Sequence, residues 1–134
     1  MEKVIITGAD GFVGSYTTHK FALEGCNVLA LDIAKEPKRI RPDKNIVYRQ
    51  CDISNIEQIQ EIIKSDLYDT MIHFAWAGSA GFSRVDYDLQ IRNVHNTVEC
   101  MKAAKKFGCK RFVCAGSIME YEVEAAVHTQ GSHP

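Results

Sequence analysis

Short apolar runs rich in β-branched residues recur along the chain, and longer segments with helical periodicity separate them. The apolar runs predict five strands, at residues 3–7, 27–32, 45–52, 70–75 and 110–116. The periodic segments predict three helices, at residues 12–24, 54–65 and 86–107. "SNIE" at 54–57 is a capping-box pattern and predicts Ser54 as the N-cap of the second helix.

Strands and helices alternate over most of the chain, so helical crossovers must join the strands, which then lie parallel. The sequence therefore predicts an α/β fold with a doubly wound parallel sheet of about five strands and helices on both faces. The run at 45–52 alternates apolar and polar residues more than the others, which places it nearer to an edge of the sheet. Residues 76–84 are predicted to form a loop. No linker divides the chain, so residues 1–134 are predicted to be one domain.

Composition and charge exclude several classes of function. The formal net charge of -1 removes the basic footprint expected of a nucleic-acid-binding protein. The N-terminus has no long apolar segment, so neither a signal peptide nor a membrane span is predicted. The five cysteines are odd in number and never spaced C-x-x-C, which is typical of reduced thiols in a cytoplasmic protein. No His, Cys or Asp cluster has metal-ligand spacing, so no metal site is predicted.

Three glycines, Gly8, Gly11 and Gly14, stand between the first predicted strand and the first predicted helix. Here Gly8 permits a tight turn, Gly11 lets a pyrophosphate approach the backbone, and Gly14 lets the helix pack closely on the sheet. The backbone amides of Phe12 and Val13 then face the anion along a favourable helix dipole. A turn that is merely rich in glycine is the alternative, but strand, glycines and helix are all in register. The pattern therefore predicts a Rossmann-type dinucleotide site, and the absence of a P-loop motif excludes a P-loop NTPase.

Asp32, at the end of the second predicted strand, indicates which dinucleotide is bound. An acid in this position accepts hydrogen bonds from the adenosine ribose and repels a 2′-phosphate, so the sequence favours NAD over NADP. Lys35, Lys38 and Arg39 belong to a basic segment, residues 35–44, that is predicted to be a solvated loop but leaves NADP as an alternative. S-adenosylmethionine enzymes also commonly have an acid after the second strand, so such an enzyme is a further alternative. It is the least favoured one, because these enzymes usually have a tighter G-x-G pattern.

Five stretches resemble, in order, the motifs of one family. "TGADGFVG" at 7–14 resembles the opening motif of the extended short-chain dehydrogenase/reductase family, the NAD-dependent epimerases and dehydratases that act on nucleotide sugars. Its later motifs are similar to "CDIS" at 51–54, "IHFAWAG" at 72–78, "RNVHNTVECMKAA" at 92–104 and "RFVCAGSIMEYE" at 111–122. The resemblance covers essentially the whole chain. Trp76 departs from it, since the family has a small residue there, and Asn96 stands where the family has glycine.

The resemblance implies a set of cofactor contacts at the ends of the later strands. They are Asp52 and Ile53, flanking the adenine, and Ala75, Trp76 and Asn93, beside the cofactor. A buried structural role for the Asn93 amide is an equal alternative. His73, on the fourth predicted strand, is interpreted as a packed core histidine and not as a ligand or base.

The resemblance also implies the chemistry, in which a serine polarises the substrate and a tyrosine with a lysine four residues on acts as the base. Ser117 matches the serine, and a cap or turn role is its alternative. Tyr16 and Lys20 form the only Tyr-x-x-x-Lys pair, but on the first helix, where it is interpreted as a coincidence. The chain is therefore expected to be the cofactor-binding N-terminal portion of a longer nucleotide-sugar epimerase, dehydratase or reductase, without turnover of its own. A non-catalytic dinucleotide-binding sensor is the alternative.

The helix predicted at 86–107 carries an apolar stripe that is interpreted as core or as a subunit interface. Its members are Tyr87, Ile91, Val94, Val98 and Met101. The interface interpretation predicts a homodimer or self-association through this helix.

Overall fold

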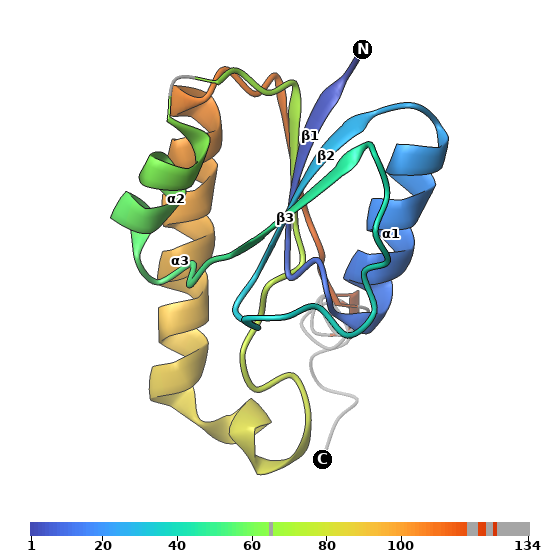
Figure 1. Ribbon diagram of the computed structural model, residues 1–134. Coiled ribbons are helices and arrows are strands. Elements are labelled where there is room, and N and C mark those ends of the chain that lie inside the picture. Colours follow the sequence, from blue (N-terminus) through green and yellow to red (C-terminus); the bar gives the residue numbers. More distant parts are fainter. Residues whose placement is uncertain (65, 118–120, 123–124, 126–134) are drawn as a thin grey trace, which may run out of the picture.

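Figure 1 shows the computed structural model of the protein, which describes residues 1–64, 66–117, 121–122 and 125. The elements follow in the order β1 (Lys3–Thr7), α1 (Phe12–Leu23), β2 (Asn27–Asp32), β3 (Ile46–Gln50), α2 (Ile56–Ile63), β4 (Thr70–His73), the 3₁₀ helix η1 (Gly81–Val85), α3 (Tyr87–Lys106) and β5 (Arg111–Cys114). The predicted strands and helices are confirmed, with ends that differ by a few residues. In this part of the chain, none of the helices has the length and apolar character needed to span a bilayer.

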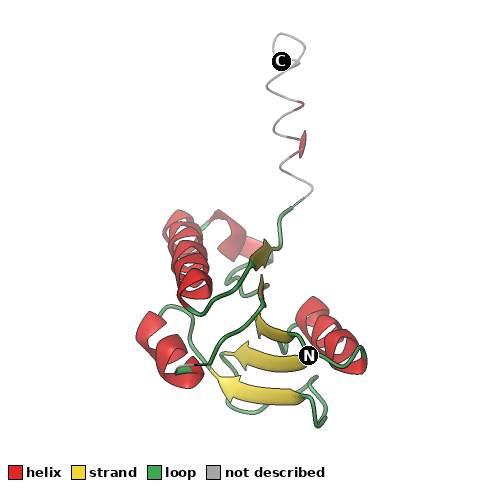
Figure 2. Ribbon diagram, turned by 90° about the horizontal axis from the view of Figure 1, so that it is seen from above, coloured by secondary structure: helices red, strands yellow, loops and turns green. Residues whose placement is uncertain are grey.

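The strands form one parallel sheet in the order β3-β2-β1-β4-β5. α1 covers one face of this sheet, and α2 and α3 cover the other (Figure 1, Figure 2). The chain therefore has the doubly wound α/β fold that its sequence predicts. β3 lies at one edge, as its alternating pattern predicts, and β5 lies at the other edge.

Both faces of the central strands are buried, because successive residues of a strand point to opposite sides of the sheet. Ile5 and Met71 belong to the core beneath α2 and α3. Val4 and Ile6 belong to the core on the other face, together with Ala22 of α1. This burial on both sides explains why the strands read as unbroken apolar runs.

The N-terminus of α2 differs from the predicted capping box. Asn55 is the N-cap, and its side chain accepts a hydrogen bond from the Gln58 backbone N–H at 3.3 Å. The Ser54 hydroxyl donates instead to Asp52 Oδ1 at 2.7 Å. The assignment of Ser54 as the cap is therefore wrong, because a neighbouring carboxylate engages this hydroxyl. Ser65, the predicted end of the helix, lies outside the described residues.

The apolar stripe of α3 faces away from the sheet. Its members are between 37% and 78% exposed, namely Tyr87, Ile91, Val94, Val98 and Met101. The face that packs on the sheet carries smaller residues, Cys100, Ala103 and Ala104, which are at most 3% exposed. The interpretation of the stripe as core is therefore wrong, and its role as an interface remains a prediction. Ahead of α3, the segment predicted as a loop partly forms η1.

Candidate functional site

A cavity of about 400 Å³ lies at the carboxyl ends of the strands, where the strand order reverses. From β1 the chain proceeds through β2 and β3 toward one edge, and it then returns to place β4 and β5 on the other side of β1. Ligands of open α/β sheets bind at such a reversal. The cavity brings together eight of the predicted cofactor-binding residues: Gly8, Gly11, Asp32, Asp52, Ile53, Ala75, Trp76 and Asn93. Ile33, Ser79 and Asn96 also line it, and no sequence signal singled these out as contacts.

The three glycines of the turn after β1 have different surroundings. Gly8 has a φ of +67°, and a Cβ there would lie 2.7 Å from the Ala75 backbone nitrogen. A Cβ on Gly14 would lie 2.0 Å from the Gly8 carbonyl oxygen, so Gly14 lets α1 pack against the turn. A Cβ on Gly11 would meet only this same oxygen, at 3.1 Å. Of the three, Gly11 is the one where a side chain would meet fewest protein atoms, and it lines the cavity.

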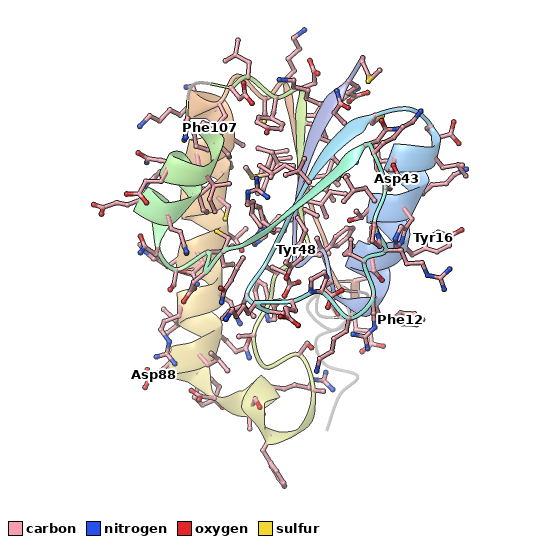
Figure 3. The ribbon with its side chains drawn as sticks, in the orientation of Figure 1. Phe12, Tyr16, Asp43, Tyr48, Asp88 and Phe107 are labelled. Carbon is pink, nitrogen blue, oxygen red and sulfur yellow. The ribbon has the colours of Figure 1, made fainter. Side chains whose placement is uncertain are left out.

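Phe12 and Val13 open α1, so their backbone N–H groups have no partner inside the helix. Their side chains are 86% and 57% exposed, and Phe12 points away from the sheet (Figure 3). Neither side chain lines the cavity. The contribution predicted for these two residues therefore rests on the backbone N–H groups alone.

Asp32 ties the second strand to the glycine turn. Its Oδ2 accepts a hydrogen bond from the Asp10 backbone N–H at 2.9 Å, and its Oδ1 accepts one from the Ala34 N–H at 3.3 Å. A carboxylate has acceptor capacity for about four hydrogen bonds, so capacity remains for the hydroxyls of a ligand. Asp32 thus has a structural role in addition to the predicted binding role.

Asp10, which the sequence did not single out, anchors the basic segment to the glycine turn. Its carboxylate accepts backbone hydrogen bonds from Lys38 at 2.8 Å, Arg39 at 2.6 Å and Ile40 at 3.0 Å. Arg39 Nη1 also donates to the Asp10 carbonyl oxygen at 3.3 Å. Burial alone would raise the pKa of Asp10, but the three backbone N–H groups and the Arg39 charge lower this pKa below its usual value. The segment predicted as a solvated loop is therefore fixed at Ile40, which is buried.

Asn93 holds the loop that follows β4. Its side chain is buried, with Oδ1 accepting from the Ala77 N–H at 3.0 Å and Nδ2 donating to the Ala77 carbonyl at 2.8 Å. These two bonds to one backbone unit support the structural alternative for Asn93, on the wall of the cavity.

A second cavity, of about 440 Å³, lies beside the first and has Ser117 in its lining. The two cavities share a wall made of Phe74, Ala75, Trp76 and Ser79. The position of Ser117 places the predicted catalytic residue at the carboxyl end of β5, beside the predicted cofactor site. Within the described residues, no group of three or more His, Cys, Asp or Glu side chains is placed to hold a metal ion.

His73 is a core residue, as predicted. It is 2% exposed, its Nδ1 lies 2.7 Å from Thr7 Oγ1, and its Nε2 lies 3.0 Å from Thr97 Oγ1. Burial lowers the pKa of the imidazole, which favours the neutral form. The side chain therefore uses both ring nitrogens in packing the sheet against α3.

Tyr16 and Lys20 do not form a catalytic pair. Tyr16 is 75% exposed and points away from the sheet (Figure 3), and Lys20 Nζ lies 2.8 Å from Glu24 Oε1 on the same helix. Neither residue lines either cavity. The Tyr-x-x-x-Lys spacing in α1 is therefore a coincidence, as predicted.

A parallel sheet whose order reverses beside β1, with a glycine turn opening into the cavity at that point, defines a Rossmann-type α/β protein. The profile of the NAD dependent epimerase/dehydratase family matches residues 4–133 of the chain. The chain belongs to this family.

Two individual relatives are similar to this chain over most of its length. The chain is 29% identical to a UDP-glucose 4-epimerase of Klebsiella pneumoniae, over 89% of this chain and 91% of the relative. It is 26% identical to a UDP-glucose 4-epimerase of Cyamopsis tetragonoloba, over 90% of this chain but only 37% of the relative.

Solved structures share the fold. An epimerase from Methanothermobacter thermautotrophicus matches with a TM-score of 0.76 and 28% identity, over 87% of this chain and 35% of that one. A Bordetella bronchiseptica enzyme in complex with NAD+ matches with a TM-score of 0.69 and 24% identity, over 84% of this chain and 38% of that one. The chain thus spans little more than a third of these solved chains.

Proposed function

We propose that the chain binds a dinucleotide in the cavity at the strand reversal. One observation carries this proposal: the backbone of Gly11 forms part of the cavity wall, opposite residues from the ends of β2, β3 and β4. A pyrophosphate on this wall meets the N-terminus of α1, where N–H groups and the helix dipole favour an anion. Asp52 and Ile53, which follow the carboxyl end of β3 and line the cavity, would flank the adenine.

NAD is the preferred dinucleotide in this proposal. The Asp32 carboxylate lines the cavity, where it would accept from ribose hydroxyls and repel a 2′-phosphate. Arg39 lies close by, since its guanidinium donates to the Asp10 carbonyl, but it does not line the cavity. We therefore expect the negative charge of Asp32, on the cavity wall, to influence the choice of dinucleotide more than the positive charge of Arg39, outside it.

The second cavity is the proposed place of chemistry in the whole enzyme. We propose a nucleotide sugar as the substrate, with Ser117 polarising its hydroxyl or carbonyl group beside the nicotinamide. Membership of the NAD dependent epimerase/dehydratase family and the UDP-sugar relatives support this choice. Transient or net hydride transfer would then require the nicotinamide and the sugar to meet directly where the two cavities adjoin, beside the residues that line both.

Calorimetric titration with NAD+ and NADP+ tests the dinucleotide site. We expect the unmodified chain to bind NAD+ more tightly than NADP+, and Gly11→Ala to weaken NAD+ binding by about tenfold or more. The reason is that the added methyl overpacks the ligand by about 1–3 kcal/mol, while meeting only one protein atom. Gly25→Ala is the matched control, because its methyl meets no atom within 4 Å and lies outside the cavity.

Two results would contradict the proposal. Equal NAD+ affinities for Gly11→Ala and Gly25→Ala would show that the pyrophosphate does not bind against the glycine turn. Tighter binding of NADP+ than of NAD+ would refute the role given to Asp32.

We also propose that the exposed stripe of α3 pairs with the same stripe of a second copy. Sedimentation velocity should show self-association of the unmodified chain, and Val94→Glu should shift it toward the monomer, because a charge in a paired apolar face is costly. Leu23→Glu is the matched control, since Leu23 is 80% exposed on α1, outside the stripe. An unmodified chain that sediments as a monomer would refute the pairing.

A further inference from the structure

Gln90, on the first turns of α3, makes four hydrogen bonds with the loop that separates the two cavities and with its own helix. Its Oε1 accepts from Trp76 Nε1 at 2.9 Å and from Asn93 Nδ2 at 3.1 Å. Its Nε2 donates to the carbonyl oxygens of Gly78 at 3.2 Å and Ser83 at 2.9 Å. The side chain therefore links the shared wall, the turn after it and η1.

These bonds use the whole capacity of the carboxamide and fix its orientation. A glutamine side chain has two acceptor positions on its oxygen and two donors on its nitrogen, and all four are occupied here. The indole N–H of Trp76 can only donate, whereas the carbonyls of Gly78 and Ser83 can only accept. A reversed amide, a carboxylate or an apolar side chain would leave at least two of these partners unsatisfied.

Gln90 and Gly78 line the second cavity and Asn93 lines the first. Trp76 is the member of this network that lines both. It is 43% exposed, so its ring is held at one edge by Gln90 and borders open space elsewhere. A large ring that changed its rotamer here would alter the shape of both cavities together. We propose that Gln90 is a positioning residue, which fixes the Trp76 indole and the 78–83 turn as the partition between the dinucleotide site and the second cavity.

The inference rests on the proposed function, because it takes the first cavity as the dinucleotide site. Its test therefore measures the Trp76 fluorescence and the NAD+ affinity separately. Trp76 is the only tryptophan of the chain, and its fluorescence therefore reports on this one position. The variant is Gln90→Glu, which keeps the size of the side chain but sets a negative oxygen against the carbonyls of Gly78 and Ser83, so that the carboxylate turns away from them and releases the Trp76 indole N–H. We expect Trp76 emission at longer wavelength, stronger quenching by acrylamide, and NAD+ binding weakened by about tenfold, with unchanged far-UV circular dichroism.

Gln60→Glu in α2 is the matched control. The Gln60 side chain accepts one hydrogen bond, from Lys106 Nζ at 3.0 Å, which a carboxylate keeps. This variant should retain the emission, quenching and NAD+ affinity of the unmodified chain. If Gln90→Glu loses its circular dichroism signal, Gln90→Met, which has a similar length and no charge, is measured in its place with the same expected result.

The outcomes separate the inference from the proposed function. Unchanged emission, quenching and NAD+ affinity in a folded Gln90 variant, with NAD+ binding by the unmodified chain, overturn the inference and leave the proposed function standing. Absence of NAD+ binding by the unmodified chain overturns the proposed function and with it the binding part of the inference. In that case the fluorescence still decides whether Gln90 fixes the indole.

Discussion

The Gly14→Ala variant is expected to lose about 3 kcal/mol or more of its free energy of unfolding, which is a large share of the stability of a small domain. The added Cβ would lie 2.0 Å from the Gly8 carbonyl oxygen and 2.9 Å from the Gly8 carbonyl carbon. Both contacts are with backbone, so no side chain can rotate to relieve them. Alanine gains about 1 kcal/mol of helix propensity over glycine, which is too little to offset the collision.

Urea denaturation followed by circular dichroism measures this effect, with Gly25→Ala as the control. Gly25 has a φ of +86°, but an alanine methyl there would have no atom within 4 Å, so the substitution costs only backbone strain, about 1–2 kcal/mol. Gly14→Ala should therefore be the less stable of the two variants. A Gly14→Ala chain as stable as Gly25→Ala would show that α1 can move away from the turn at little cost.

The order of the elements and the glycine turn were predictable because local signals encode them. The central strands β1, β2 and β4 are apolar on both faces, and glycines stand at several of the turns, so these boundaries are marked in the sequence where they occur. Of the cavity residues, Gly8, Gly11 and Asp32 were indicated by local motifs, whereas Asp52, Ile53, Ala75 and Trp76 were indicated only by the resemblance to the family's motifs. The parallel sheet explains why they meet. In a parallel sheet all strand ends meet at one edge, so residues far apart in the sequence come together without any side chain specifying it.

The face of α3 that packs on the sheet was not predictable from apolar periodicity. Periodicity finds the side with the largest apolar residues, and in α3 this side is exposed. The helix approaches the sheet through Ala103 and Ala104, whose small side chains permit close packing but give a weak hydrophobic signal. The cap of α2 was missed for a similar reason, since both Ser54 and Asn55 are good caps and Asp52 decides between them.

Asp10 and Gln90 were missed because backbone groups are the main partners of the Asp10 carboxylate and half of the partners of the Gln90 side chain. Asp10 binds N–H groups 28 to 30 residues later in the chain, and Gln90 binds the carbonyls of Gly78 and Ser83. Every residue type offers such groups, so no pattern of side chains in the sequence reveals the pairing. Polar side chains of this kind become visible only when the fold brings the loops of the site around them.

The Asp10→Ala variant should also be strongly destabilised, by about 3 kcal/mol, because three backbone N–H groups lose their acceptor at about 1 kcal/mol each. The loop at Lys38 to Ile40 would then detach from the glycine turn, and NAD+ binding should weaken with it. Asp10→Asn is the matched control. Its amide oxygen can still accept from Arg39 and Ile40, but its NH₂ group opposes the Lys38 N–H, so we expect roughly half of the loss.

The pH dependence of stability shows whether the negative charge of Asp10, and not only its ability to accept hydrogen bonds, stabilises the fold. Because the folded pKa of Asp10 lies below its unfolded value of about 3.9, the ionised carboxylate stabilises the fold above that pH, and the contribution disappears as pH falls through the folded pKa. The difference in unfolding free energy between the unmodified chain and Asp10→Ala should therefore be largest near neutral pH and smaller in acid. Urea titrations at neutral pH and at about pH 3 measure it. A difference that stays constant over this range would mean that the carboxylate charge contributes nothing, and that Asp10 stabilises the loop only as a neutral hydrogen-bond acceptor.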